Sequence, residues 1–135
     1  MKKTRFELSI KEQEIMELFW NSEDGLTSVD IYEQLRDSVL NSTYVHRALN
    51  TLIDKNLIKE CGSIRYNKQY ARKFKAVYTK EEYAANLLNE KGLHLNSLKG
   101  IATAFIKQSN FDNAYTKAEI INELKLLIDE IDKGE

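Results

Sequence analysis

Residues 41–54 read NSTYVHRALNTLID, and this stretch decides the fold that the sequence predicts. Placed on a helix at about 100° per residue, its apolar side chains share one face. These are Val45, Ala48, Leu49 and Leu52. The opposite face carries Thr43, Arg47, Asn50 and Asp54. One face of this helix is therefore expected to pack on a core, while the other stays free to bind a partner.

Composition sets outer bounds on the fold and on the site. The chain has 135 residues, 42% of them hydrophobic, which suffices for one core-forming domain or one small domain with an appendage. No apolar run approaches the roughly 18 residues of a membrane span, and Met1-Lys2-Lys3 leads into no signal-like stretch, so we expect a cytoplasmic protein without a membrane partner. Cys61 is the only cysteine, and no zinc spacing surrounds His46 or His94. We expect neither a metal nor a cofactor.

Charge is divided unevenly along the chain. The net charge is -1, but residues 1–80 hold 14 Lys and Arg against 11 Asp and Glu, a net +3, and residues 81–135 hold 6 against 10, a net -4. Within residues 59–80, Glu60 is the single acid among seven cations. These cations are Lys59, Arg65, Lys68, Arg72, Lys73, Lys75 and Lys80. A local basic patch of this kind is the electrostatic footprint of phosphate binding.

Helix starts follow from capping chemistry, because a Ser or Thr side chain satisfies free backbone N–H groups and an acid three residues later completes the box. The pairs are Ser9 with Glu12, Thr27 with Asp30, Thr79 with Glu82, and Thr116 with Glu119. We expect helices over residues 10–20, 28–36, 41–56, 80–90, 95–108 and 117–132. The core positions expected in the first two are Ile15, Leu18, Phe19, Val29, Ile31 and Leu35.

Residues 57–78 lose the helical period and gain β-branched and aromatic side chains, which predicts a ribbon of two or three strands. Gly62 and the Asn67-Lys68 pair are the candidate turns. The aromatic positions fit more than one register, so the strand limits stay open. Cys61 is expected to be a buried or half-buried strand residue with a structural role.

The last two predicted helices carry wide apolar stripes. The stripes are Leu98, Ile101, Ala102 and Phe105, and then Ile120, Leu124, Leu127 and Ile131. They present more apolar surface than a three-helix tail can hide in itself, which favours a homodimer interface. The alternative is that the tail folds back on the first domain. We therefore divide the chain into domains 1–79 and 80–135.

Three helices, a β-ribbon and a helical tail make a mainly α fold with a small β-wing, namely a winged helix-turn-helix domain plus a C-terminal helical dimerisation module. The segments LSIKEQEIMELFW (8–20), STYVHRALNTLIDKNLIKE (42–60), YTKEEYAANLL (78–88) and SLKGIATAFIK (97–107) are similar to the penicillinase-repressor family of bacterial winged-helix transcriptional repressors. The resemblance implies a homodimer that represses a resistance or stress-response gene from a palindromic operator in double-stranded DNA.

The resemblance also implies DNA-binding residues. It places the start of the recognition helix in the major groove, which here means Ser42, Thr43, Tyr44, Arg47 and Thr51. A helix N-terminus binds phosphates, and an arginine one turn further along can reach a guanine edge. The wing would lie along phosphates through Arg65, Lys68, Arg72 and Lys73.

Members of this family are inactivated by two routes, and each route depends on a short sequence motif. Copper-sensing members carry Cys-x-Cys motifs near the C-terminus, whereas this chain ends IDEIDKGE, which excludes that route. Antibiotic-resistance members are cut by a sensor protease at an Asn-Phe bond, and the corresponding position here is Ala104-Phe105. This pair is the candidate proteolytic site and a sensor protease the candidate partner, although the missing asparagine predicts a poor substrate. The pair Asn110-Phe111, expected in the loop that follows, is the more accessible candidate bond. Release by a ligand at the dimer interface is the other alternative.

Other interpretations of the same residues predict different surfaces. Tyr44 could read DNA or pack against a neighbouring element, and His46 is expected to pack. A winged-helix protein-protein adaptor without sequence-specific DNA binding would need an apolar exposed face around Thr43 and Arg47. No Ser/His/Asp order, Gly-rich phosphate loop or metal spacing indicates an enzyme.

Overall fold

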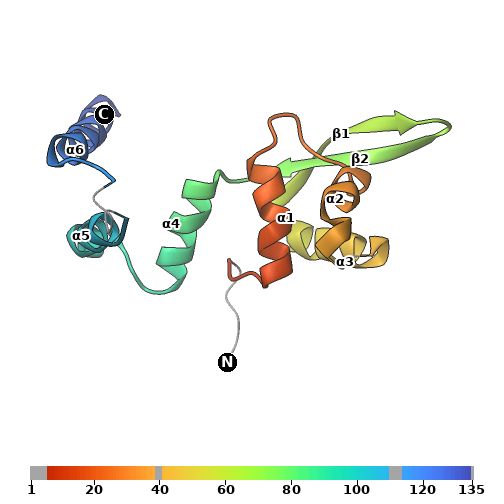
Figure 1. Cartoon of the computed structure of the whole chain (residues 1–135), viewed down its shortest axis with the longest axis horizontal. Coiled ribbons are helices and arrows are strands. Elements are labelled where there is room, and N and C mark those ends of the chain that lie inside the picture. The colour runs from red at the N-terminus through yellow and green to blue at the C-terminus, as the bar shows by residue number, and fades with distance from the viewer. Residues whose placement is uncertain (1–5, 39–40, 110–113, 135) are drawn as a thin grey trace. The chain divides into compact units, whose positions relative to one another are not determined.

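The computed structural model describes residues 6–38, 41–109 and 114–134. They fall into two compact units, Met1–Gly92 and Leu93–Glu135 (Figure 1). The sequence predicted a division after Thr79, but the helix that follows packs with the first unit, because Tyr83 is buried there and its hydroxyl donates to the Phe6 carbonyl at 2.6 Å. The functional division at residues 79 and 80 stays a prediction.

The helices of the first unit are α1 (Ile10–Trp20), α2 (Ser28–Leu35), the 3-10 turn η1 (Arg36–Ser38), α3 (Ser42–Asp54) and α4 (Lys80–Glu90). Of these, α1, α2 and α4 begin where the Ser and Thr capping pairs predict. The boxes at Ser9, Thr27 and Thr79 are all formed, with backbone and side chain bonded in both directions. Local polar chemistry therefore fixes where α1, α2 and α4 begin.

The core of the first unit lies between α1, α2, α3 and the base of the hairpin. Its buried apolar residues are Phe6, Ile15, Met16, Phe19, Ile31, Val45, Ala48, Leu49, Leu52, Leu57, Ile58, Phe74 and Tyr83. The four apolar residues predicted on α3 are all buried, and Leu18 and Trp20 are half-buried against this core. The prediction for Val29 is wrong: it is 44% exposed, because it lies two residues and so about 200° round the helix from buried Ile31.

The ribbon is one antiparallel hairpin of β1 (Ile58–Tyr66) and β2 (Gln69–Ala76), with Asn67 and Lys68 at the turn. Figure 1 shows it projecting past α2. Gly62 is not a turn, since it stays in β1 beside a bulge between Glu60 and Gly62. The base of the hairpin is held by Leu26 and Phe74, whose backbones exchange two hydrogen bonds of 2.8 Å.

Cys61 is exposed, so the expectation of a buried or half-buried strand residue is wrong. It is the extra residue of the bulge, and a bulged residue is left out of the cross-strand pairing. Its thiol lies 3.9 Å from the Asp24 carbonyl oxygen.

The second unit contains the 3-10 turn η2 (Leu95–Ser97), α5 (Leu98–Ser109) and α6 (Lys117–Lys133). The fourth predicted capping box, Thr116 with Glu119, starts α6. Among its described residues no side chain is buried. In the part of the chain that the structure describes, no helix is long and apolar enough to cross a membrane.

Candidate nucleic-acid interface

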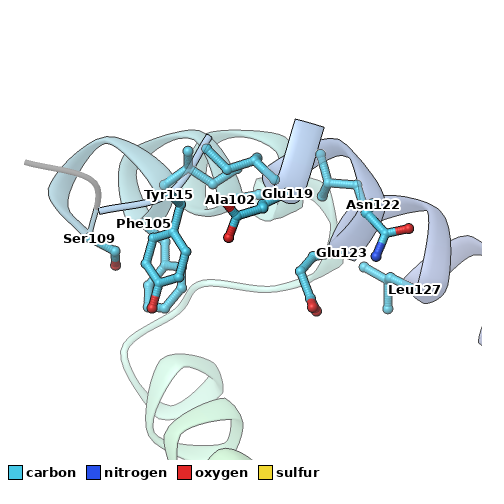
Figure 2. Close-up of a pocket in the computed structure, with 11 residues that line it drawn as sticks. Ala102, Phe105, Ser109, Tyr115, Glu119, Asn122, Glu123 and Leu127 are labelled. Atoms are coloured by element: carbon cyan, nitrogen blue, oxygen red, sulfur yellow. The ribbon is translucent and has the colours of Figure 1, made fainter. Parts of the chain in front are cut away.

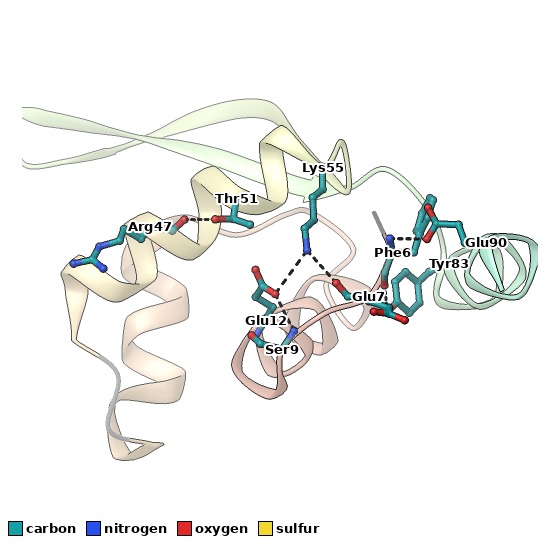
Figure 3. Close-up of polar contacts among 9 residues, drawn as sticks. All are labelled: Phe6, Glu7, Ser9, Glu12, Arg47, Thr51, Lys55, Tyr83 and Glu90. Carbon is teal, nitrogen blue, oxygen red and sulfur yellow. Dashed lines mark hydrogen bonds and ion pairs between the residues drawn. The ribbon is translucent and has the colours of Figure 1, made fainter. Parts of the chain in front are cut away.

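The outward face of α3 is polar. Ser42, Thr43, Arg47 and Asn50 are exposed, while the apolar side of the helix packs on the core. Figure 3 shows the Arg47 side chain extending away from the surrounding elements, and no ion pair within the described residues engages it. Without an ion pair, the N–H donors of the Arg47 guanidinium are available to bind a base edge or a phosphate.

The N-terminus of α3 is free of negative charge. The capping-box helices each place a carboxylate in the first turn, whereas α3 is capped by the neutral Asn41, whose Oδ1 accepts the Tyr44 N–H at 2.7 Å. No acidic residue follows in the first turn of α3. The N–H groups of Ser42 and Thr43 and the positive end of the helix dipole are therefore not neutralised by a side chain, which suits an anion such as a DNA phosphate.

Three further residues of α3, next to its polar face, differ in burial and in the contacts they make. Tyr44 is half-buried and packs against the core, so its aromatic ring serves the fold. Thr51 is half-buried, and its hydroxyl donates back to the Arg47 carbonyl at 3.1 Å (Figure 3). His46 is exposed, contrary to the expectation that it packs. DNA contact by Tyr44 and Thr51 stays a prediction.

The hairpin separates the four predicted wing cations. Cross-strand partners lie on one face, and the register pairs Arg65 with Tyr70 and Ser63 with Arg72. Arg65 and Arg72 thus share a face, Lys73 lies on the opposite face, and Lys68 lies at the turn. Arg72 is 3.6 Å from Glu60, but both side chains are more than half exposed, so this pair is weak. The phosphate-binding roles of these cations stay a prediction.

Two features of the hairpin were missed by sequence reasoning. Tyr70 is 69% exposed and its ring centroid lies 5.9 Å from the Arg65 guanidinium, so an aromatic stands in the basic face. On the other face Lys59 and Lys75 are direct cross-strand partners. Like charges at such positions repel unless an anion joins them. The alternation of residues along each strand shows which side chains share a face of the hairpin, but only when the pairing of the two strands is known.

The hairpin is fastened to the helices near its turn as well as at its base. The hydroxyls of Tyr66 and Thr27 are 3.2 Å apart, and Thr27 is the fully buried N-cap of α2. The basic faces of the wing are therefore held at a set position relative to α2 and the core.

The predicted stripes of the second unit are open to solvent. Leu98, Phe105, Leu124, Leu127 and Ile131 are 40–70% exposed, and Ile101, Ala102 and Ile120 are half-buried. A groove of about 720 Å³ lies between α5 and α6, and Phe105, Tyr115, Leu124 and Leu127 line it (Figure 2). Roles for these residues at a dimer interface stay a prediction.

The candidate scissile bond lies within a helix. Ala104 and Phe105 are both exposed on α5, whereas Asn110-Phe111 lies outside the described residues.

Within the described residues, no group of three or more His, Cys, Asp or Glu side chains could hold a metal ion.

Several solved structures are similar to parts of this chain. The peroxide-sensing regulator PerR from Streptococcus pyogenes shares 12% identity at a TM-score of 0.43, over 52% of this chain and 47% of that protein. This chain thus spans about half of PerR. The ferric uptake regulator of Vibrio cholerae shares 11% identity, with a TM-score of 0.40, over 66% of this chain and 83% of that one. Its counterpart from Francisella tularensis shares 17%, with a TM-score of 0.39, over 70% and 87%.

No curated protein matches the chain. The family model described as penicillinase repressor matches residues 8–130, which is nearly the whole chain and includes α1, α3, the hairpin and most of the tail. The order of three helices, a two-stranded wing and a helical tail agrees with that match. The chain therefore belongs to the penicillinase repressor family of DNA-binding transcriptional regulators.

Proposed function

We propose that the protein represses transcription by binding a palindromic operator as a homodimer, and that the gene it controls serves resistance or stress response. The observation that carries the proposal is the uncharged N-terminus of α3 with exposed Ser42, Thr43 and Arg47 behind it. In this arrangement backbone N–H groups fix a phosphate, and Arg47 reads a base edge one turn further along. The polar face offers no apolar surface of the kind that an adaptor would use.

The wing supplies affinity. Arg65, Lys68 and Arg72 would each neutralise a phosphate and release counterions, which gives binding energy without sequence information. Lys73, on the other face of the hairpin, would meet the same backbone only if the duplex follows the twist of the wing.

Dimerisation would come from the second unit, whose apolar stripes are exposed in one chain. A two-fold axis through this surface places two copies of α3 on symmetric half-sites, so the operator is expected to be a palindrome. The experiment that tests the proposal is selection of bound sequences from random duplex DNA by the full chain. An enriched inverted repeat supports it, and enrichment of no sequence contradicts it.

Base reading and phosphate binding are expected to separate by mutation. Arg47→Ala should cost about 1–3 kcal/mol on the selected operator and reduce discrimination against variants at one position. Arg72→Ala or Lys68→Ala should weaken binding to all duplexes alike and flatten the salt dependence by about one unit for each phosphate that is no longer neutralised. Fluorescence anisotropy titrations at several salt concentrations measure both effects.

The control for these variants is Lys11→Ala, which removes the same charge from α1. It should change neither discrimination nor the salt slope beyond the small effect of net charge. Equal loss of discrimination in the helix and wing variants would contradict the assignment of roles.

A sensor protease stays a predicted partner, with Ala104-Phe105 as the family position. We expect poor cleavage there, because a protease binds its substrate extended and this bond lies inside α5, without the family's asparagine. Fragments recovered from producing cells treated with a β-lactam report the cut through their terminal residues. Restoring the family residue with Ala104→Asn should raise cleavage, and a clean cut of the unaltered chain between Ala104 and Phe105 would contradict the expectation.

A further inference from the structure

Residues 6–9, named here the N-terminal strap, are bonded to α4. The Phe6 N–H donates to Glu90 Oε1 at 2.8 Å, and the Tyr83 hydroxyl donates to the Phe6 carbonyl at 2.6 Å. The Phe6 ring is buried, with the rings of Tyr78 and Tyr83 at 5.7 and 6.0 Å. Lys91, the C-cap of α4, adds an ion pair to Glu7 at 3.0 Å. These contacts tie the strap to α4.

The hydroxyl that closes this contact keeps its proton. Burial raises the pKa of the Tyr83 hydroxyl, and the carboxylates of Glu90, Glu12 and Glu7 raise it further. At neutral pH the group is therefore a donor, as the bond to the Phe6 carbonyl requires.

The same strap is bonded to the recognition helix. Lys55 is the C-cap of α3, and its ammonium donates to the Glu7 carbonyl at 3.0 Å. It also lies 3.9 Å from the carboxylate of Glu12, and the two side chains are 23% and 14% exposed. That carboxylate also accepts the Ser9 N–H at 2.9 Å, so Lys55, Glu12 and the strap are joined in one group of polar contacts (Figure 3). An ion pair with this little solvent is screened far less than a surface pair.

The contacts form one continuous connection from α3 through the strap to α4. Lys55 bonds to the backbone of the strap, and the backbone bonds to Tyr83 and Glu90 on either side of the same residue, Phe6. Both ends of the connection are helices of eleven residues or more. A rotation of α4 against α3 would therefore have to break these bonds or carry the strap with it.

We propose that Lys55 is a positioning residue that, through the N-terminal strap, fixes the orientation of the recognition helix relative to α4. Because α4 precedes the tail in the chain, this orientation is expected to contribute to the half-site spacing that a dimer accepts. The inference rests on the proposed function, since spacing has meaning only for a dimer on two half-sites.

The test uses the full chain and duplexes from the selection, with one or two base pairs inserted between the half-sites. The unaltered chain should lose affinity about ten-fold or more on insertion, within the usual range of coupling between sites. Lys55→Met should reduce that penalty to about three-fold or less, while binding to a single half-site stays nearly unchanged. Lys55→Arg should restore the penalty, and Lys11→Met is the control for lost charge.

Amide hydrogen exchange of the free full chain tests the connection without DNA. Lys55→Met should speed exchange of the α4 amides, by about three- to ten-fold, because a freed strap lets α4 open locally. Lys11→Met should not. An insertion penalty unchanged by Lys55→Met, with lowered thermal stability, would overturn the proposal and leave Lys55 a purely structural residue. If no duplex is enriched, the proposed function fails, and unchanged exchange in α4 would then overturn the connection itself.

Discussion

A chain that ends at Gly92 is expected to fold, to stay monomeric, and to bind operator DNA about 100-fold or more weakly than the full chain. Every buried apolar side chain of the described residues lies between Phe6 and Tyr83, so this truncation removes none of the core. It removes the exposed stripes of α5 and α6. Binding of the second half-site then becomes bimolecular, and the effective concentration that a linked partner provides is lost.

A matched pair of leucines tests the same interface in the full chain. Leu127 belongs to the α6 stripe and is 48% exposed, whereas its neighbour Leu126 is 50% exposed but points about 100° away round the helix. Leu127→Asp should yield a monomer by light scattering and weaken operator binding as the truncation does, since a buried charge without a partner opposes association. Leu126→Asp should stay dimeric. A dimer that survives in both the truncated chain and Leu127→Asp would contradict the assigned interface.

The sequence predicted the capped helix starts well because they depend on neighbours in the chain. Ser9 with Glu12 and Thr79 with Glu82 are separated by three residues, and each pair satisfies its own helix start in the structure. The same holds for the apolar face of α3, where one helical period fixes which side packs. The failure at Val29 shows the limit of composition, since an apolar residue in a short helix was assigned to the core against its angular position.

Features that depend on pairing across the chain could not be predicted. The bulge at Cys61 decides which side chains of β1 share a face with Arg72, and nothing local to β1 reveals a residue left out of the ladder. The same holds for the link between Lys55 and the strap, whose bonded residues are 48 positions apart. Contacts of this kind form only when distant segments pack on the same core. Neither the faces of the wing nor the bonds of the strap therefore follow from local sequence.

Gly25 is the position where one added methyl group should cost most. Its φ is +93°, which L side chains rarely adopt, and a Cβ there would lie 2.6 Å from the Phe74 carbonyl oxygen. That carbonyl accepts the Leu26 N–H at 2.8 Å in the bridge that holds the base of the wing. Gly25→Ala is therefore expected to lower the free energy of unfolding by about 3 kcal/mol, through backbone strain and loss of the bridge.

Urea denaturation measures this cost, and Gly100→Ala is the matched control. A Cβ at Gly100 meets nothing within 4 Å, and alanine is a better helix former than glycine inside α5, so stability should rise by up to about 1 kcal/mol. The folded fraction of Gly25→Ala should also bind DNA with a flatter salt dependence, because a wing freed at its base no longer holds Arg65 and Arg72 against phosphates. If Gly25→Ala loses the expected free energy of unfolding but keeps the same salt slope, the Leu26–Phe74 bridge supports the core and does not position the wing. The wing would then be positioned by its other fastening, the hydroxyl contact between Tyr66 and Thr27.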